Sequence, residues 1–85
     1  MAEQKIGVVS HYFGKAGVAG IEITDGELHV GDTIHIKGHT SDFTQTIDSM
    51  QIEHETVGVA KAGDSIGVKV TEHAREHDIV YRITN

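Results

Sequence analysis

The sequence predicts an all-β domain, folded as a small closed or partly open barrel of six to seven antiparallel strands. Apolar and polar residues alternate through several short segments, as they do in strands that bury one face. Gly-Asp and Asp-Gly pairs stand between those segments, where tight turns are expected. The hydrophobic residues make up 38% of the chain, and most are valine or isoleucine, which are enriched in strands.

Residues 1–85 are predicted to form a single β-barrel domain, because this length supports one small core. The chain has no cysteine, which excludes disulfides and thiolate metal sites. Its first residues lack the apolar run of a signal peptide, and no segment approaches the ~18 apolar residues of a membrane helix. We therefore expect a cytoplasmic protein without membrane contact.

The first two predicted strands are residues 4–13 and 18–24, joined by a loop over residues 14–17. Neighbouring side chains in a strand point to opposite faces. Tyr12 and Phe13 therefore cannot both face the interior, and we expect one of them to face solvent.

A hairpin signal at Asp25-Gly26 follows the second strand. A short link through Leu28 then leads to a turn at Gly31-Asp32. Together with a second Gly-Asp turn at residues 63–64, this turn predicts an all-β meander.

Residues 33–37 form the third predicted strand. Ile34 and Ile36 should face the core, because they alternate with polar residues. The same alternation places His35 on the outer face beside Lys37.

A polar loop precedes a long predicted strand over residues 43–53. Phe43 and Ile47 share one face of this strand, whereas Met50 lies on the other. A twist or bulge midway is expected to exchange inside and outside.

The turn at Gly63-Asp64 leads into a strand over residues 66–70. A charged connection over residues 72–77 has no apolar face, so no helix is expected there. Residues 79–83 form the last predicted strand.

The net charge of −6, with histidines neutral, disfavours one class of partner. Binding to nucleic acids is driven by lysine and arginine, which displace counterions from the phosphates. Direct strong nucleic-acid binding is therefore not expected.

Two glycine patterns were considered as sites. Residues 63–67 match G-x-S-x-G, but that nucleophile motif needs a strand-to-helix turn in a large α/β sheet. We interpret Ser65 as part of a turn into a strand. Gly14, Gly17 and Gly20 precede a strand, where a dinucleotide site requires a helix, so no nucleotide binding is expected.

Seven histidines are an unusual number for this length. His73 and His77 have a spacing that suits a metal only on a helix, and His54 is flanked by Glu53 and Glu55. As scattered single residues, the histidines are interpreted as exposed strand positions. No metal site and no cofactor are predicted.

Three segments carry a resemblance to a known family: residues 31–38, residues 49–52 and, most specifically, Ala-Lys-Ala-Gly-Asp-Ser-Ile-Gly at 60–67. They resemble the second domain of the translational GTPases, such as elongation factor Tu, elongation factor G and initiation factor two. The resemblance covers residues 6–83 and implies a β-barrel of the translation-protein type. In that family a separate domain hydrolyses the nucleotide. The family's Glu-Arg-Gly arm reads Thr-Asp-Gly at residues 24–26, so binding of the tRNA end is not implied.

Residues 75–81 also resemble the end of barrels appended to collagenase-like peptidases, and of small stand-alone elongation-factor-like proteins. His77 stands where those barrels usually have glycine. The turn at His77 is therefore expected to be longer or strained.

These features predict a protein that is not an enzyme. The first hypothesis is a stand-alone translation-factor-like barrel that binds a protein or ribosome-associated partner through a rim of Tyr12, Lys15, Lys37 and Phe43. Exposed aromatic residues beside lysine favour recognition, although these aromatics could equally plug the barrel ends. Two alternatives stay open: a histidine-mediated divalent-metal or pH-responsive protein, and an accessory subunit of a peptidase-like enzyme.

Overall fold

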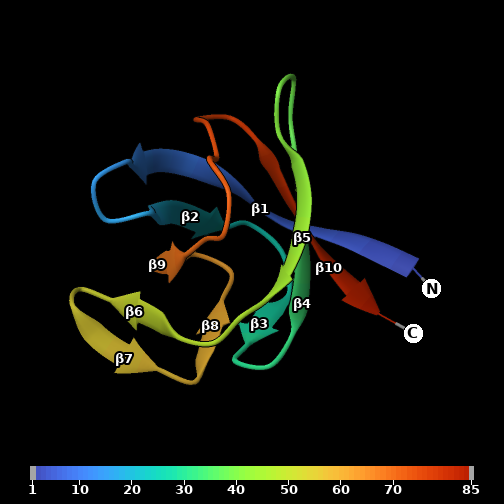
Figure 1. Ribbon diagram of the computed structural model, residues 1–85. Coiled ribbons are helices and arrows are strands. Elements are labelled where there is room, and N and C mark those ends of the chain that lie inside the picture. Colours follow the sequence, from blue (N-terminus) through green and yellow to red (C-terminus); the bar gives the residue numbers. More distant parts are fainter. Residues whose placement is uncertain (1, 85) are drawn as a thin grey trace.

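The computed structural model describes residues 2–84, which contain ten strands and no helix. Eight strands form one antiparallel sheet in the order β5-β4-β10-β1-β2-β9-β6-β7, and the other two pair as β3-β8 (Figure 1). The all-β prediction is confirmed. The strands are β1 (Ala2–Phe13), β2 (Val18–Ile23), β3 (Glu27–His29), β4 (Thr33–Lys37), β5 (Asp42–Thr46), β6 (Met50–Ile52), β7 (Glu55–Val57), β8 (Val59–Lys61), β9 (Ser65–Lys69) and β10 (Ile79–Thr84).

The large sheet curls into a partly open barrel (Figure 1). β5 and β6 follow one another in the chain, yet they lie at or near opposite edges of the sheet, so the sheet must bend round to bring these edges together. β5 pairs with β4, whereas β6 pairs with β9. β5 and β9 do not pair with each other, and the Gln45 side chain bridges them. Its Nε2 donates to the Lys69 carbonyl at 2.9 Å, and its Oε1 accepts the Thr71 N–H at 2.8 Å. A side chain thus replaces the backbone ladder at this seam.

The prediction of one strand over residues 43–53 is wrong, because β5 ends at Thr46 and β6 begins at Met50. The break has a packing reason. Phe43, Ile47 and Met50 are 6%, 1% and 0% exposed, yet a continuous strand would direct Met50 to the opposite face. The break between the strands exchanges the two faces, as the expected twist or bulge would, and all three side chains reach the core.

Three further strands, β3, β7 and β8, have three residues each and were not predicted. Leu28, which was expected in a link, lies in β3 and is fully buried. Periodicity cannot identify such elements, since three residues hold too little alternation to be recognised. The other five predicted strands are present, with bounds within about two residues of those expected.

The core is almost entirely aliphatic and lies inside the curled sheet. It forms because residues two apart on each strand point the same way, and the inward positions are held by isoleucine and valine. The largest fully buried side chains are Ile6, Val9, Ile21, Leu28, Ile34, Ile36, Ile47, Met50, Val68 and Val80.

Three turns share one construction. In each, an aspartate carboxylate accepts the backbone N–H three residues earlier at 2.9 Å, and the aspartate N–H donates to the carbonyl of that earlier residue. The residue before each aspartate has a positive φ. The three turns end at Asp32, Asp64 and Asp78.

Glycine precedes the first two of these aspartates, which confirms the turns predicted at Gly31-Asp32 and Gly63-Asp64. At the third turn, His77 takes the same position with a φ of 75°. Left-handed backbone is costly for a residue with a Cβ, so the expected strain at His77 is confirmed. Within residues 2–84 there is no helix long and apolar enough to cross a membrane.

Candidate functional site

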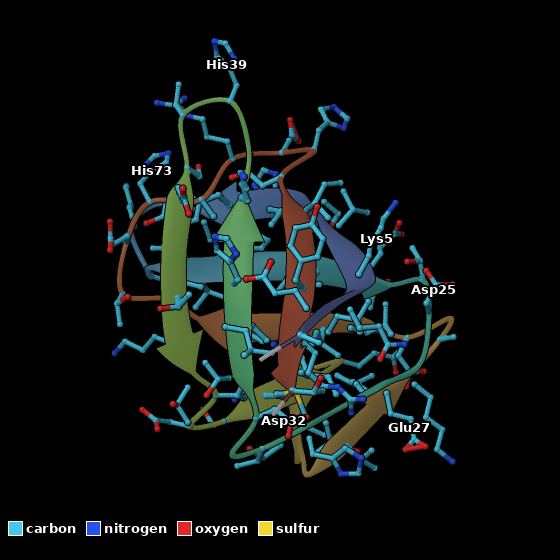
Figure 2. The ribbon with its side chains drawn as sticks, turned by 90° about the vertical axis from the view of Figure 1, so that its right-hand side faces the viewer. Lys5, Asp25, Glu27, Asp32, His39 and His73 are labelled. Carbon is cyan, nitrogen blue, oxygen red and sulfur yellow. The ribbon has the colours of Figure 1, made fainter. Side chains whose placement is uncertain are left out.

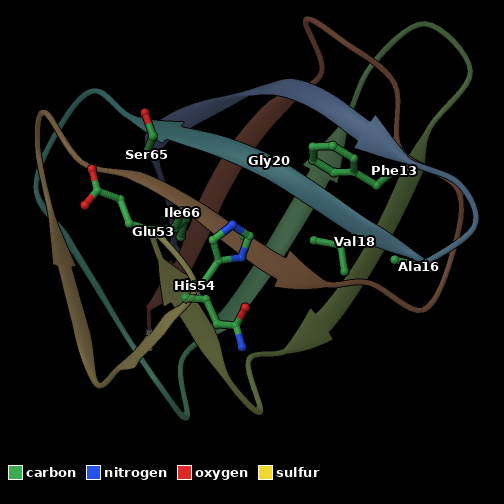
Figure 3. Close-up of a pocket in the computed structure, with 10 residues that line it drawn as sticks. Phe13, Ala16, Val18, Gly20, Glu53, His54, Ser65 and Ile66 are labelled. Carbon is green, nitrogen blue, oxygen red and sulfur yellow. The ribbon is translucent and has the colours of Figure 1, made fainter.

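A groove of about 460 Å³ lies on the outer face of β2, β9 and β6 (Figure 3). This volume falls within the range of ligand-binding pockets. The end of β1 and the loop after it form one wall, and the turn between β6 and β7 forms another. The lining residues that matter below are Phe13, Val18, Gly20, Glu53, His54 and Gly67.

Two glycines form the floor of the groove. Gly20 on β2 pairs directly with Gly67 on β9. Both face outward, because the residues on either side of each glycine are buried in the core. A glycine inside a strand often marks a place where a ligand or another backbone approaches closely. Here two facing strand positions without side chains leave a trough on the sheet.

One end of the groove is apolar. Phe13 is 51% exposed and lies near Val18 and Ala16 (Figure 3). Tyr12 is half-buried and packs against the core, which confirms that one of these neighbouring aromatics faces solvent. The pairing of β1 with β2 shifts register between Val9 and His11. This irregularity comes just before Tyr12 and Phe13 in the strand.

The other end of the groove is polar. Glu53 and His54 are the two central residues of the β6–β7 hairpin, with φ values of 50° and 69°. Two-residue hairpin turns with positive φ at both positions normally use Asn-Gly or a similar pair. For residues with a Cβ, this backbone costs roughly 1–2 kcal/mol each. Strain of this kind concentrates at functional sites.

The polar side chains at this end are free. Within residues 2–84, neither the Glu53 carboxylate nor the His54 imidazole forms a hydrogen bond or ion pair. Ser65 lies near them (Figure 3). It opens β9 directly after a turn, which confirms our interpretation of the G-x-S-x-G match. In the described part of the chain, no histidine nitrogen hydrogen-bonds a serine hydroxyl.

β4 lies between β5 and β10 (Figure 2). A second polar cluster is built around His35 on β4. His35 Nδ1 is 2.8 Å from Glu3 Oε2, and His35 Nε2 is 2.5 Å from Asp42 Oδ1. The Tyr81 ring is 6.0 Å from the imidazole, centroid to centroid. We call Glu3, His35 and Asp42 the clasp, because they join β1, β4 and β5.

The clasp changes the titration of its members. The hydrogen bond that Asp42 accepts is the main cause that raises the pKa of His35; Glu3 adds to it and burial opposes it. The same hydrogen bond lowers the pKa of Asp42. His35 points outward as predicted, but only 14% of its side chain is exposed. Our interpretation of the histidines as exposed strand positions is therefore wrong for His35. Four others are exposed but lie outside the strands: His39, His54, His73 and His77.

Among the described residues, no three histidine, aspartate or glutamate side chains converge as metal ligands. The two clasp carboxylates approach different nitrogens of one imidazole. That arrangement suits hydrogen bonding with a protonated histidine.

Comparison with known proteins identifies the family. Residues 16–80 match the family model described as Elongation factor Tu domain 2. The chain belongs to this family. The chain is also 42% identical over 78 residues to an uncharacterized protease of Methanocaldococcus jannaschii. This match covers 91% of the chain and 19% of the relative.

A collagenase of Porphyromonas gingivalis is 42% identical to this Elongation factor Tu domain 2 chain over 72 residues, with 84% of this chain and 20% of the collagenase covered. The chain thus spans about a fifth of the length of these curated relatives. Their names describe proteins that are much longer than the region matched here.

Two solved structures share the fold. One is the C-terminal domain of a Geobacillus thermoleovorans protein described as a U32 peptidase, with a TM-score of 0.87, 19% identity, and 95% of this chain and 93% of that chain covered. The other is GDP-bound aIF5B from Aeropyrum pernix, with a TM-score of 0.64, 16% identity, and 94% and 14% covered. Both likenesses support the translation-protein type of barrel.

In this Elongation factor Tu domain 2 barrel, the residues expected to form a binding rim have unequal positions. Phe43 on β5 is 6% exposed and belongs to the core. Lys37 is exposed at the end of β4, and Lys15 is exposed in the loop after β1. Tyr12 stacks against His73 with ring centroids 4.2 Å apart. The structure therefore leaves the two lysines available and Phe43 covered.

The groove was not predicted from the sequence. Gly20 and Gly67 each belong to a glycine motif, and neither motif indicates a groove. Each glycine occupies an outward position in an alternating strand, and this signal was visible. That the two glycines face each other depends on the register between β2 and β9.

Proposed function

We propose that this chain is a non-catalytic accessory module that binds polypeptide for a peptidase-type protein. The observation that carries the proposal is the 42% identity, over 91% of the chain, with a relative named as a protease. The chain matches about a fifth of that relative, so on this proposal the hydrolytic chemistry belongs to the remainder. This is the accessory role considered from the sequence.

The geometry supports binding over catalysis. The groove combines an exposed aromatic end, a floor without side chains and a few free polar groups, which is the usual composition of a ligand site. Catalysis by a serine would need a base within hydrogen-bond reach. No histidine in residues 2–84 provides one for Ser65.

A ribonucleoprotein partner is the second candidate. It rests on the fold shared with aIF5B at 16% identity, and a shared fold does not transmit function. The net charge of −6 also opposes approach to a phosphate backbone. The proposal therefore names polypeptide as the ligand.

Fluorescence anisotropy with labelled, unfolded casein tests this proposal, with labelled ribosomal RNA as the competing ligand. We expect the chain to bind casein with a Kd of roughly 1–100 μM, to leave it uncleaved, and to bind RNA more weakly. Ser65→Ala tests the serine-hydrolase alternative, because it removes the hydroxyl that would act as the nucleophile. Absence of casein binding, preference for RNA, or cleavage that Ser65→Ala abolishes would each overturn the proposal.

A further inference from the structure

We infer that the groove binds an extended peptide segment in which an apolar side chain lies two residues from a lysine or arginine. This inference names the ligand of the proposed function and rests on it. The apolar side chain lies against Phe13 and Val18, and the basic side chain reaches Glu53 and Glu22.

At Gly67, the floor of the groove is open for a reason other than folding. A Cβ added at Gly67 would meet the Val18 Cγ1 at 3.5 Å, an ordinary van der Waals distance, and its φ is not left-handed. A glycine inside a strand weakens that strand. The fold therefore does not require glycine at this position, whereas a ligand that lies on the sheet does.

The turn at the polar end carries strain that a different sequence would avoid. Glu53 and His54 both adopt left-handed backbone where Asn-Gly would fit without strain. Both side chains line the groove (Figure 3). The strained turn is thus the element that aims a carboxylate and an imidazole at the trough.

The charges at the two ends differ. Glu22 on β2 is exposed and pairs with Ser65 across the strands, so it extends the acidic end. Within residues 2–84, neither Glu22 nor Glu53 has an ion-pair partner. At the opposite end, exposed Lys69 pairs with Val18. A basic side chain is therefore attracted to the Glu22–Glu53 end and repelled from the apolar end.

The length of the groove fits this ligand. Val18 and Glu22 are four positions apart on one strand, which is about 13 Å. In an extended peptide, side chains two residues apart share a face and are separated by about 7 Å. The flexible stem of a lysine or arginine covers the remaining distance.

The experiment measures the affinity of end-capped, fluorophore-labelled peptides that share one frame, Gly-Leu-Ser-Lys-Gly. We expect the Leu-Ser-Lys peptide to bind at least about tenfold more tightly than its Leu-Ser-Glu or Ala-Ser-Lys counterpart. The Leu-Ser-Glu peptide without its N-terminal cap carries a positive α-amino group but no basic side chain. It tests whether the groove recognises the α-amino group in place of the side chain. If that peptide binds as tightly as Leu-Ser-Lys, the assignment of a basic side chain is overturned.

Gly67→Val places a side chain in the trough, and Gly58→Val is its matched control because Gly58 has open space and no left-handed φ. We expect Gly67→Val to weaken Leu-Ser-Lys binding about tenfold or more, and Gly58→Val to leave it unchanged. Glu53→Gln should weaken binding several-fold and reduce its salt dependence. Thermal melts of each variant check that it is folded.

The outcomes separate the two proposals. If casein binds the parent chain and Gly67→Val equally well, the ligand lies elsewhere: this inference fails and the accessory role stands. If casein does not bind at all, the proposed function itself fails. If a short single-stranded RNA binds in place of peptide and Gly67→Val abolishes that binding, the peptide assignment is overturned.

Discussion

The polar side chains on two outer faces of one sheet differ in their bonding: one set is hydrogen-bonded and the other is not. On the face formed by β4 and β5, the Glu3 and Asp42 carboxylates each form a hydrogen bond with His35. On the face formed by β2, β9 and β6, Glu53 and His54 have no partner in residues 2–84 and are held by strained backbone. Proteins break local rules mainly where they function. The comparison supports the proposal that the groove face serves recognition, whereas the bonded side chains of the clasp face serve stability.

The largest change in the free energy of unfolding is expected from a substitution at Gly38, the residue that follows β4. A Cβ at Gly38 would overlap the carboxylate of Asp78, which is 4% exposed and holds the Arg75 N–H. Gly38→Ala should therefore lower the free energy of unfolding by about 2–3 kcal/mol. Urea denaturation measures the loss.

The matched change on the groove face is Gly67→Ala. Its Cβ meets nothing closer than 3.5 Å, so the free energy of unfolding should change by less than about 0.5 kcal/mol. Equal losses for the two alanine variants would contradict the idea that packing requires a glycine at residue 38 and not at residue 67.

The strained backbone at His54 can be relieved by mutation, which tests whether this turn lowers stability while it contributes to binding. His54→Gly removes the Cβ from a residue with a φ of 69°, and it should raise the free energy of unfolding by about 0.5–1 kcal/mol. The same change removes an imidazole from the groove wall, so peptide binding should weaken. Urea denaturation and anisotropy, measured on one preparation, give both results. A variant that gains stability and keeps full affinity would show that the turn has no role in recognition.

His77→Gly is the counterpart outside the groove. His77 has a φ of 75° in the third of the aspartate turns, and the gain in stability should again be about 0.5 kcal/mol or a little more. Peptide affinity should stay unchanged, because His77 does not line the groove. Weaker binding in this variant would indicate that the two turns are coupled.

The smallest effect is the pH dependence of the clasp. A histidine with a raised pKa adds stability below its unfolded value of 6.5, and this contribution is lost as the pH rises through the folded pKa. An aspartate with a lowered pKa adds stability above 3.8, and this contribution is lost as the pH falls through the folded pKa. The clasp therefore contributes most between these two values.

His35→Gln tests this dependence by thermal denaturation at about pH 5 and pH 8.5. We expect the variant to lower Tm by a few degrees at the lower pH and by less at the higher pH, because the His35 contribution is lost as the pH rises through its raised pKa. Peptide binding at the groove should not follow the same pH profile. A Tm difference that is equal at both values would remove the clasp from the account of stability.

The fold was predictable because its information is local. The alternation of Ile34 and Ile36 with polar neighbours, and the glycine before Asp32 and Asp64, need no knowledge of distant residues. The strand break at Ile47 was foreseen only as a twist or bulge, since which of the apolar residues turn inward depends on what they pack against.

The candidate site was less predictable because it depends on register. Gly20 and Gly67 become one floor only after β2 and β9 pair in a particular alignment. The burial of Phe43 and the exposure of Phe13 could not be assigned from composition, because both aromatics follow a plausible strand pattern. The contacts of His35 with Glu3 likewise join segments far apart in the chain.

The pairing of the first and last strands has a consequence for how such a barrel is used. Ala2 lies beside Thr84, and both described ends of the chain lie at the side of the molecule away from β2, β9 and β6 (Figure 1). A longer host polypeptide would enter and leave the module at a single point, without passing over the trough. The same unit is therefore portable: fused to a new host, it would present its recognition surface outward with no redesign.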